Sequence, residues 1–236
     1  MLSQLRITPG SPSRDIEMNL ERSVKKRFYK LRSLLPIFRT NFTPAVSRIH
    51  LACGNNVLPG WLNTDFYPEG GAMFMDFTRR FPFATASFDA AFCEHSIEHI
   101  EKSDAAFMCR EVHRVLKPGG RFRVVTPSIE KFAKLALSSE SATTRNYLEW
   151  FRTWSNDPHA SLSDALNAWF FKHGHRHLFT NEELSDLLRQ TGFQNIRILE
   201  PEEYGDPVFS GVDGHGKVVG SHINSSEAIA VEAQKA

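Results

Sequence analysis

Short apolar runs alternate with longer segments of helical spacing through most of the chain. The runs are bounded by turn-forming residues, as strands are, and lie at 49–53, 62–65, 72–77, 87–93, 121–127, 193–199 and 227–233. Between them, apolar residues spaced three and four apart predict helices, which lie at 105–116 and 181–192. Strands that alternate with helices predict an α/β fold of three layers around a central sheet.

The connection between the first two runs is short. Only a few residues, among them Pro59 and Gly60, separate 49–53 from 62–65. Parallel strands need a crossover of about a dozen residues, usually a helix. We therefore expect a clipped or single-turn helix at this point.

The N-terminal part has a different pattern. Residues 1–15 are polar, whereas 16–35 form an amphipathic pattern whose other face is rich in Lys and Arg. We divide the chain into an extension, 1–44, and a domain, 45–236. The basic helix fits peripheral contact with an anionic membrane, but a helix docked on the domain with a solvated basic face is the favoured interpretation.

Residues 129–171 are mostly helical in pattern and rich in aromatic residues, and His173, His175 and His177 follow them. We treat 129–179 as a helical insertion over the acceptor. Its aromatic rings could stack on a sugar or an aromatic acceptor, or simply pack helix on helix. The pattern favours neither alternative. The sequence predicts loops for 200–225.

Composition narrows the classes of protein. The chain has 236 residues and a net charge of +1, so no overall field favours nucleic acid or membrane. The three cysteines are an odd number in apolar surroundings, which indicates reduced thiols in a cytoplasmic protein. We find neither a signal-peptide pattern nor an apolar run long enough for a membrane span.

Small residues follow the first run and an acid ends the second. Ala52, Cys53 and Gly54 leave little side-chain bulk, and the N–H groups of the turn can face a polar ligand. Asp65 can accept hydrogen bonds from both hydroxyls of a ribose. Together they indicate the first half of a nucleotide-type site.

Several short motifs then occur in a recognisable order. They are Leu51-Ala52-Cys53-Gly54, Asp65, Asp76-Phe77, Ser87-Phe88-Asp89, Glu98-His99-Ile100, Arg114-Val115-Leu116-Lys117-Pro118-Gly119-Gly120 and Thr126-Pro127. Over about residues 48–200 the chain resembles the class I S-adenosylmethionine-dependent methyltransferases. Gly60-Trp61-Leu62-Asn63-Thr64-Asp65 is similar to a bacterial branch, type 11-like, of that family.

The resemblance implies a Rossmann-like sandwich whose seven-stranded sheet is mostly parallel, with the last strand antiparallel. S-adenosyl-L-methionine is the implied cofactor. Residues implied to bind it are Ala52, Cys53, Gly54 and Asn55 at the methionine end, Asp65 at the ribose, Asp76 and Phe77 at the adenine, and Glu94 and His95 beside the sulfonium. Ala52 stands where the family usually has glycine, which suits a tight turn if its φ is negative.

Candidate catalytic residues are histidines, since a base near pH 7 is most simply His. His95 follows the fourth strand and is the first candidate for the base, with orientation of the cofactor as the alternative role. His175 and His177 could contact the acceptor. Glu98 and His99 are expected to cap and pack the start of the next helix.

Two patterns bear on metals. His95 to His99 matches His-x-x-Glu-His, the inverted zinc-protease motif, but its position at a strand end in an α/β sheet argues against a protease. His173, His175 and His177 could ligate a metal only if a carboxylate joins them. A loop that closes over the acceptor is the favoured interpretation, so we expect no metal.

The expected function is methyl transfer from S-adenosylmethionine to a small-molecule or glycan acceptor, at oxygen. The branch that the chain resembles often accompanies surface-polysaccharide synthesis. A nucleic-acid acceptor is disfavoured because Asn/Asp-Pro-Pro-Tyr and Pro-Cys are absent. A non-catalytic binding module of the same fold is the alternative. A nicotinamide-dependent oxidoreductase is disfavoured because Gly-x-Gly-x-x-Gly is missing.

The basic helix generates a first testable prediction. If it works on a lipid-linked precursor at the inner membrane face, deletion of residues 1–44 will lower co-sedimentation with anionic vesicles. Partitioning that is unchanged by the deletion would contradict a membrane role for 16–35.

Overall fold

The computed structural model describes Phe28, Leu31 and residues 43–236. The chain divides into two units, 1–38 and 39–236, and the description below concerns the second. The predicted helix over 16–35 lies outside the described residues, except that Phe28 and Leu31 are helical and exposed.

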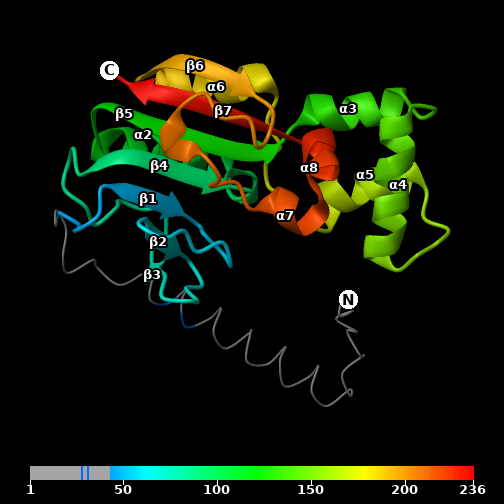
Figure 1. Cartoon of the computed structure of the whole chain (residues 1–236), viewed down its shortest axis with the longest axis horizontal. Helices are drawn as coiled ribbons and strands as arrows, with labels where there is room; N and C mark the ends of the chain where they lie inside the picture. The colour runs from blue at the N-terminus through cyan, green and yellow to red at the C-terminus, as the bar shows by residue number, and fades with distance from the viewer. Residues whose placement is uncertain (1–27, 29–30, 32–42) are drawn as a thin grey trace. The chain divides into compact units, whose positions relative to one another are not determined.

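A seven-stranded sheet forms the centre of the domain, with the strand order β3-β2-β1-β4-β5-β7-β6 (Figure 1). The strands are β1 (Arg48–Leu51), β2 (Leu62–Asp65), β3 (Met73–Phe74), β4 (Phe88–Glu94), β5 (Leu116–Pro127), β6 (Phe193–Leu199) and β7 (Ala228–Lys235). Neighbours from β3 to β5 pair in parallel, whereas β7 runs antiparallel to both β5 and β6. The predicted sheet with a reversed last strand is confirmed.

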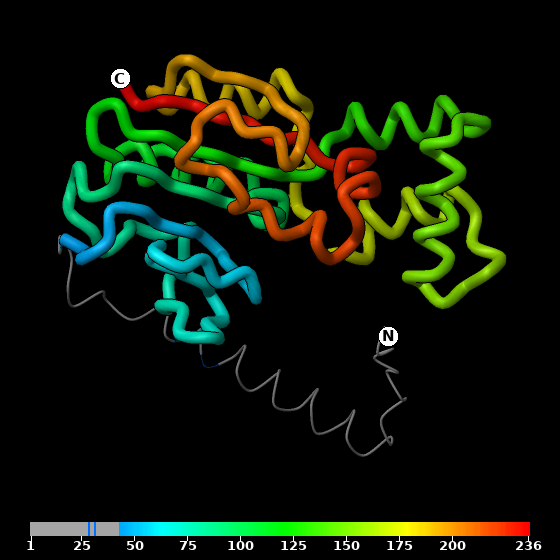
Figure 2. Tube along the Cα trace, in the orientation of Figure 1, coloured from blue at the N-terminus to red at the C-terminus, as the bar shows by residue number. Residues whose placement is uncertain are grey.

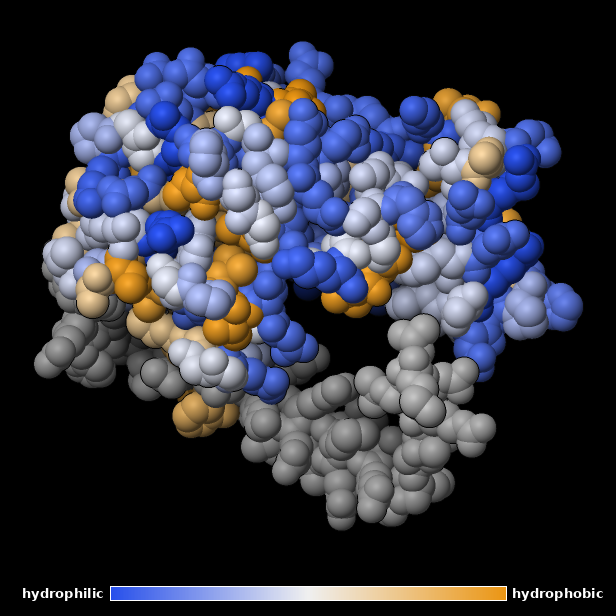
Figure 3. Space-filling model, viewed as in Figure 1, coloured by the Kyte–Doolittle hydropathy of each residue, from blue (hydrophilic) through white to orange (hydrophobic). Residues whose placement is uncertain are grey.

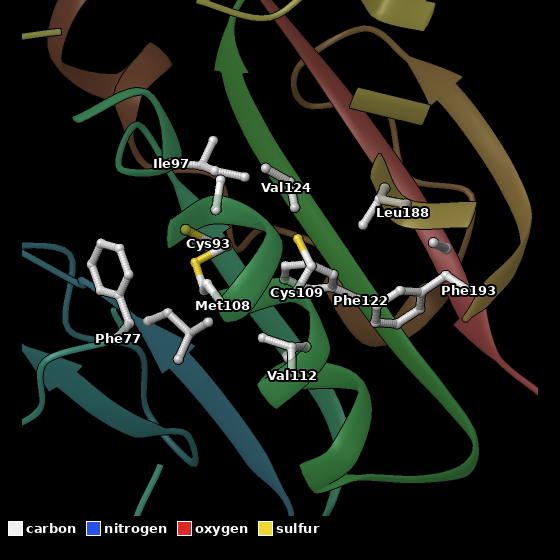
Figure 4. Close-up of a cluster of buried hydrophobic side chains, with 14 of the residues drawn as sticks. Phe77, Cys93, Ile97, Met108, Cys109, Val112, Phe122, Val124, Leu188 and Phe193 are labelled. Atoms are coloured by element: carbon white, nitrogen blue, oxygen red, sulfur yellow. The ribbon is translucent and has the colours of Figure 1, made fainter. Parts of the chain in front are cut away.

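The main core lies between the sheet and two helices, α2 (Lys102–Val115) and α6 (Asn181–Gln190). Met108 and Val112 of α2 and Leu188 of α6 are buried with Phe122 and Val124 of β5 (Figure 4). Their spacing along each helix gives one apolar stripe, and its removal from water is the main force that holds these layers together.

The segment between β6 and β7, residues 200–227, contributes to the other face of the sheet. Phe209 and Val212 of this β6–β7 segment pack with Trp61 against Phe92 and Val125. The prediction of loops over 200–225 is wrong in part, because the segment contains η2 (Pro207–Phe209), α7 (His215–Val219) and α8 (Ser221–Glu227). Each of these helices is seven residues long or shorter, which is too short to show a helical periodicity in the sequence.

Three further helices, α3 (Ile129–Leu137), α4 (Ala142–Ser155) and α5 (Leu162–Phe171), form a helical lobe. The lobe has its own core, which includes Phe132, Tyr147, Phe151, Trp169 and, from α8, Ile223. It lies beyond the carboxyl ends of β4 and β5, with α7 and α8 between it and the sheet (Figures 1 and 2). The predicted helical content of 129–171 is confirmed.

The β1–β2 connection differs from its prediction, because residues 52–61 contain turns and no helix. The side-chain amide of Asn63 takes the place of helical hydrogen bonds. Its Oδ1 accepts from Leu58 N at 2.9 Å, and its Nδ2 donates to the carbonyls of Leu58 and Trp61 at 2.9 and 3.1 Å. One partly buried amide thus fixes a connection that is too short for a crossover helix.

Two element boundaries also differ from the prediction. Strand β3 is only two residues long, because Asp76 turns the chain by accepting hydrogen bonds from the N–H and hydroxyl of Thr78. Helix α2 has Glu101 at its N-cap and begins at Lys102. The helix therefore begins before the range of 105–116 that the sequence predicts, and Ser103 and Asp104 lie in its first turn.

The described helices offer no membrane span, and the face drawn in Figure 3 shows no continuous apolar surface. None of the helices in the described ranges is long and apolar enough to cross a bilayer. In the view of Figure 3, hydrophobic residues form separate patches among hydrophilic ones.

Arg123, in the middle of β5, is fully buried and tied to the β6–β7 segment. Its Nε and Nη2 donate to the carboxylate of Asp213 at 2.9 and 2.5 Å, and its Nη1 donates to Glu232 at 2.7 Å. Nη1 also donates to the carbonyl of Glu203 at 3.0 Å. Two carboxylates compensate the buried guanidinium, and the pairing joins the segment to the sheet.

We predict that Arg123→Met destabilises the protein by about 3–5 kcal/mol, because it leaves two buried carboxylates without their cation. Urea unfolding measures the change. Arg121→Met is the matched control, because Arg121 lies two residues away on the same strand and forms a partly exposed ion pair with Asp206 at 2.8 Å. Loss of this exposed ion pair should lower the free energy of unfolding by about 1 kcal/mol or less. Equal effects of the two substitutions would contradict the anchoring role of Arg123.

Candidate active site

The turn after β1 lies at the edge of the sheet where parallel strands end. Ala52 and Gly54 both adopt left-handed conformations, each with φ of 50°. The expectation of a negative φ at Ala52 is therefore wrong, and this conformation costs a non-glycine residue about 1 kcal/mol. A Cβ on Gly54 would meet nothing within 4 Å, so the backbone is open to a ligand at this point.

Asp65, at the end of β2, is held against this turn. Its Oδ2 accepts from Gly54 N at 2.9 Å and its Oδ1 accepts from Tyr67 N at 2.6 Å. A carboxylate has about four acceptor positions, so each oxygen keeps one for a ligand hydroxyl. The structure thus brings Asp65 and the open turn, both predicted as parts of the cofactor site, into direct contact.

Cys53 lies between these two residues in the chain. Its N–H donates to the carbonyl of Thr64 at 2.9 Å, which joins the turn to β2. Burial, with Asp65 nearby, raises the pKa of the Cys53 thiol to about 11. The thiol is therefore protonated at neutral pH and does not act as a nucleophile. Asn56, two residues beyond Gly54, donates to the carbonyl of Val212 at 3.0 Å.

The two residues predicted at the adenine have other contacts. Asp76 binds Thr78 and forms an ion pair with Arg79 at 3.3 Å. The ring of Phe77 belongs to the main core (Figure 4). Phe66 directly follows Asp65, and its ring lies 5.7 Å from that of Phe74. Sequence reasoning did not consider Phe66, which its position directly after Asp65 makes a further candidate for contact with the adenine.

Glu94, at the end of β4, binds the β6–β7 segment. Its carboxylate accepts from Gly214 N at 2.9 Å and from His215 N at 3.2 Å. Burial raises the pKa of Glu94, while these two backbone donors lower it. The structure thus gives Glu94 a structural contact at the edge where the sequence predicted a wall of the cofactor site.

His95 follows Glu94 and is almost enclosed. It has a φ of 45°, and its ring lies 3.9 Å from the ring of His215. Its Nε2 makes no direct hydrogen bond to a described residue, although the side chain of Asn224 lies close enough to raise the pKa of the ring. Burial, with His215 next, lowers the pKa of His95 well below its usual value. The imidazole is neutral, with a free nitrogen at the end of the central strand.

Glu98 lies in η1 (Ile97–His99) and is fully buried. Its Oε2 accepts from the hydroxyl of Thr126 at 3.0 Å, whereas its Oε1 has no hydrogen-bond partner and lies 3.6 Å from Nδ1 of His95. Burial raises the pKa of Glu98 to about 7. The expectation that Glu98 caps the next helix is wrong, because its side chain contacts β5 and His95.

The histidines after α5 take different directions. His175 lies beside His99, with ring centroids 4.9 Å apart. His177 donates from Nε2 to Glu183 of α6 at 2.9 Å. The ring of His173 stacks on Trp169 at 4.7 Å. Of the predicted catalytic residues His175 and His177, the structure therefore places the first beside His99 and Glu98 and binds the second to α6.

The residues present fit S-adenosylmethionine. The open left-handed turn at Gly54 contacts Asp65, whose carboxylate retains acceptor positions for two hydroxyls. The neutral His95 lies at the carboxyl end of β4, the strand that pairs with β1 on the other side from β2. In such a sheet, ligands bind at the carboxyl ends of the strands. Asp65 would hold the ribose, and the backbone of residues 52–54 would adjoin the methionine end.

A comparison with protein families matches residues 67–124 to a model described as a methyltransferase domain. This stretch includes β4, His95, Glu98 and α2. The match thus includes His95 and Glu98 of the candidate site but not the 52–54 turn or Asp65.

Solved structures of methyltransferases are similar to the chain at low identity. An S-adenosylmethionine-dependent methyltransferase from Thermotoga maritima is 17% identical with a TM-score of 0.45, and 94% of this chain and 97% of that chain are covered. Another from Archaeoglobus fulgidus is 15% identical with a TM-score of 0.46, and 91% and 94% are covered. Haemonchus contortus phosphoethanolamine N-methyltransferase 2, in complex with S-adenosyl-L-methionine, is 14% identical with a TM-score of 0.47, over 92% of this chain and 52% of that chain. This chain spans about half the length of the Haemonchus enzyme. Because each TM-score is below 0.5, we take the fold from the strand order itself.

We predict that Asp65→Ala weakens binding of S-adenosylhomocysteine by about tenfold or more, since a hydrogen bond to a charged group contributes about 1.5–3 kcal/mol. Isothermal titration calorimetry measures the affinity. Asp89→Ala is the control, because Asp89 is an exposed acid near the start of β4 and pairs with Lys117 at 2.7 Å. An unchanged affinity in Asp65→Ala would contradict the assigned ribose site.

Strand order, site and family match agree with one another. The reversed last strand, the turn that meets Asp65 and the matched stretch from 67 to 124 all have the positions that the sequence motifs imply. Residues 67–124 are thus similar to a methyltransferase domain, and the site at the carboxyl ends of the strands fits S-adenosylmethionine as its cofactor.

Proposed function

We propose that this protein transfers the methyl group of S-adenosylmethionine to a hydroxyl of a glycan or small-molecule acceptor. The observation that carries the proposal is the free Nε2 of the buried, neutral His95 at the carboxyl end of β4. A hydroxyl acceptor must lose its proton during transfer, and a positioned neutral imidazole is suited to accept it.

The bonds made and broken in this methyl transfer, and the proton that is released, are accounted for by the cofactor, the acceptor hydroxyl and His95. When bound, S-adenosylmethionine supplies a methyl carbon on a cationic sulfur, so that a C–O bond forms while the C–S bond breaks and its electron pair stays on sulfur. His95 accepts the hydroxyl proton at Nε2. The side chain of Glu98, with Oε1 3.6 Å from Nδ1 of His95, is placed to stabilise the protonated ring, while alignment of the reactants supplies much of the acceleration.

Aromatic rings on the helical lobe support a sugar acceptor. Trp154 is 52% exposed and its ring lies 5.1 Å from that of His173. His173 in turn stacks on Trp169, which stacks on His175 at 5.3 Å. This row extends from an exposed tryptophan to the cluster near Glu98. Flat aromatic faces of this kind pack well against the apolar faces of sugar rings.

A place in surface-polysaccharide synthesis is part of the proposal and rests on the resemblance to the bacterial branch. Peripheral membrane contact through 16–35 would suit a lipid-linked glycan precursor. The deletion of residues 1–44 tests that contact separately from the chemistry.

A non-catalytic binding module is the second candidate function. The side chain of Glu94 is taken by backbone N–H groups of the β6–β7 segment, and Ala52 replaces the usual glycine in a strained turn. Such a module would bind S-adenosylmethionine and acceptor without turnover. The two candidates therefore differ in product formation and not in cofactor binding.

Transfer of radiolabelled methyl groups to a panel of free sugars, oligosaccharides and small alcohols tests the proposal. With an active acceptor, we predict that His95→Gln lowers kcat by about 10²–10⁴-fold, the usual contribution of a general base. His113→Gln is the control, because His113 lies in the last turn of α2 and packs on Phe193 at the start of β6, away from the carboxyl end of β4. The absence of any methylated product with intact cofactor binding would favour the non-catalytic module, whereas full turnover in His95→Gln would exclude His95 as the base.

A further inference from the structure

Glu98, His99 and His175 form a compact set of potential metal ligands. Their ligand atoms all lie within 4.8 Å of one another, and Oε1 of Glu98 is 3.9 Å from Nε2 of His99. Glu98 and His99 belong to η1, whereas His175 comes from the loop after α5. That loop is held in place because the carbonyl of Glu98 accepts from Arg176 N at 2.7 Å and from His177 N at 3.2 Å.

Both histidines are oriented as metal ligands usually are. Nδ1 of His175 donates to the carbonyl of Trp169 at 2.8 Å, and Nδ1 of His99 faces the carbonyl of Gly174 at 3.4 Å. With each Nδ1 directed at a backbone carbonyl, Nε2 is the nitrogen left to bind a ligand. A hydrogen bond from the second ring nitrogen to such an acceptor is the common way in which proteins fix a metal-bound imidazole.

The carboxylate provides an independent indication. Glu98 is fully buried, yet its Oε1 has no hydrogen-bond partner among the described residues. Thr126 holds the other oxygen and so fixes the direction of the carboxylate. A buried carboxylate oxygen without a partner is costly, and a cation between Oε1 and the two imidazoles would supply the missing interaction.

We propose that Glu98, His99 and His175 bind one divalent first-row transition-metal ion. Two imidazoles and one carboxylate favour zinc, manganese, iron or cobalt over magnesium or calcium, which prefer sites made of oxygen alone. Ligands bound at about 2.0–2.2 Å in a tetrahedron lie about 3.4 Å apart, so a small contraction completes the site. His99, whose side chain is 42% exposed, can make it by rotation.

The sequence alone could not establish this set. The sequence predicts a metal site at His173, His175 and His177 only if a carboxylate lies close to them. In the structure Glu98 is that carboxylate, and of the three histidines only His175 lies with it. The His-x-x-Glu-His spacing placed Glu98 beside His99, but the third ligand depends on the approach of the distant loop. Three protein ligands with an exposed side leave a coordination position for a further oxygen ligand.

If the proposed function holds, that position adjoins the base. Oε1 of Glu98 is 3.6 Å from Nδ1 of His95, so the ion would lie beside the His95 ring, on the side of Nδ1 and not of Nε2. Binding of an acceptor hydroxyl to the ion would favour loss of its proton. This step rests on the proposed function, whereas metal binding does not, and the experiment below measures binding without cofactor or acceptor.

The test is titration of the full-length, chelator-treated protein with Co²⁺ and Zn²⁺. We expect one equivalent of Co²⁺ to bind with visible d–d absorption, Zn²⁺ to displace it, and the melting temperature to rise with either ion. His175→Ala and Glu98→Gln should each weaken Zn²⁺ binding by about tenfold or more. His99→Ala should do the same, and because His99 is exposed this variant keeps the fold.

His173→Ala is the matched control, since His173 is two residues from His175 in the same loop but outside the cluster. It should bind Zn²⁺ like the unchanged protein. Absence of binding, or equal weakening in His173→Ala and His99→Ala, would overturn the proposal. Tight binding together with no methyl transfer to any acceptor would support the metal site and count against the proposed function alone.

Discussion

The buried ion pairs of Arg123 are the constraint on which the site depends. A guanidinium in the middle of a central strand is tolerated only with its charge compensated, and Asp213 supplies most of that compensation from the β6–β7 segment. Asp213 also accepts from Glu202 N at 2.8 Å. Asp213 therefore joins the start of the β6–β7 segment, at Glu202, to the sheet. The two residues after Asp213, Gly214 and His215, donate hydrogen bonds to Glu94 at the carboxyl end of β4.

A second set of buried groups connects the helical lobe to the same segment. Glu227, at the end of α8, is fully buried and accepts from Tyr147 of α4 at 3.2 Å and from His215 at 3.2 Å. Burial raises the pKa of Glu227, and the hydrogen bond from His215 lowers it. Because Trp169 donates to the hydroxyl of Tyr147, the network reaches α5. The aromatic row and the loop of His175 are thus positioned relative to β4 by polar contacts as well as by apolar packing.

The sheet could be predicted because its information is local. Apolar runs such as 87–93 predict strands and their order along the chain, and the family resemblance implies the reversed last strand. The acid at Asp65 was predicted for the same reason, since it ends a strand beside a turn of small residues. The left-handed φ of Ala52 was not, because no local signal distinguishes it from an ordinary turn.

The rest depends on contacts between distant parts of the chain. The side chain of Asn63 holds the β1–β2 connection without a helix, and the β6–β7 segment with its short helices is bound by Arg123 and Glu94. Glu98 resembles a helix cap in sequence, but residues 174–177 pack against it in the structure, so that its carboxylate lies close to His99 and His175. Such effects of tertiary structure cannot be read from spacing.

The central claim is that the edge formed by the 52–54 turn, Asp65 and His95 binds S-adenosylmethionine in a productive orientation. A crystal structure with S-adenosylhomocysteine tests it most directly. We predict that both ribose hydroxyls lie within hydrogen-bond distance of the Asp65 carboxylate and that the ligand sulfur lies on the side of His95. Binding at another edge of the sheet, or a ribose without contact to Asp65, would contradict the account.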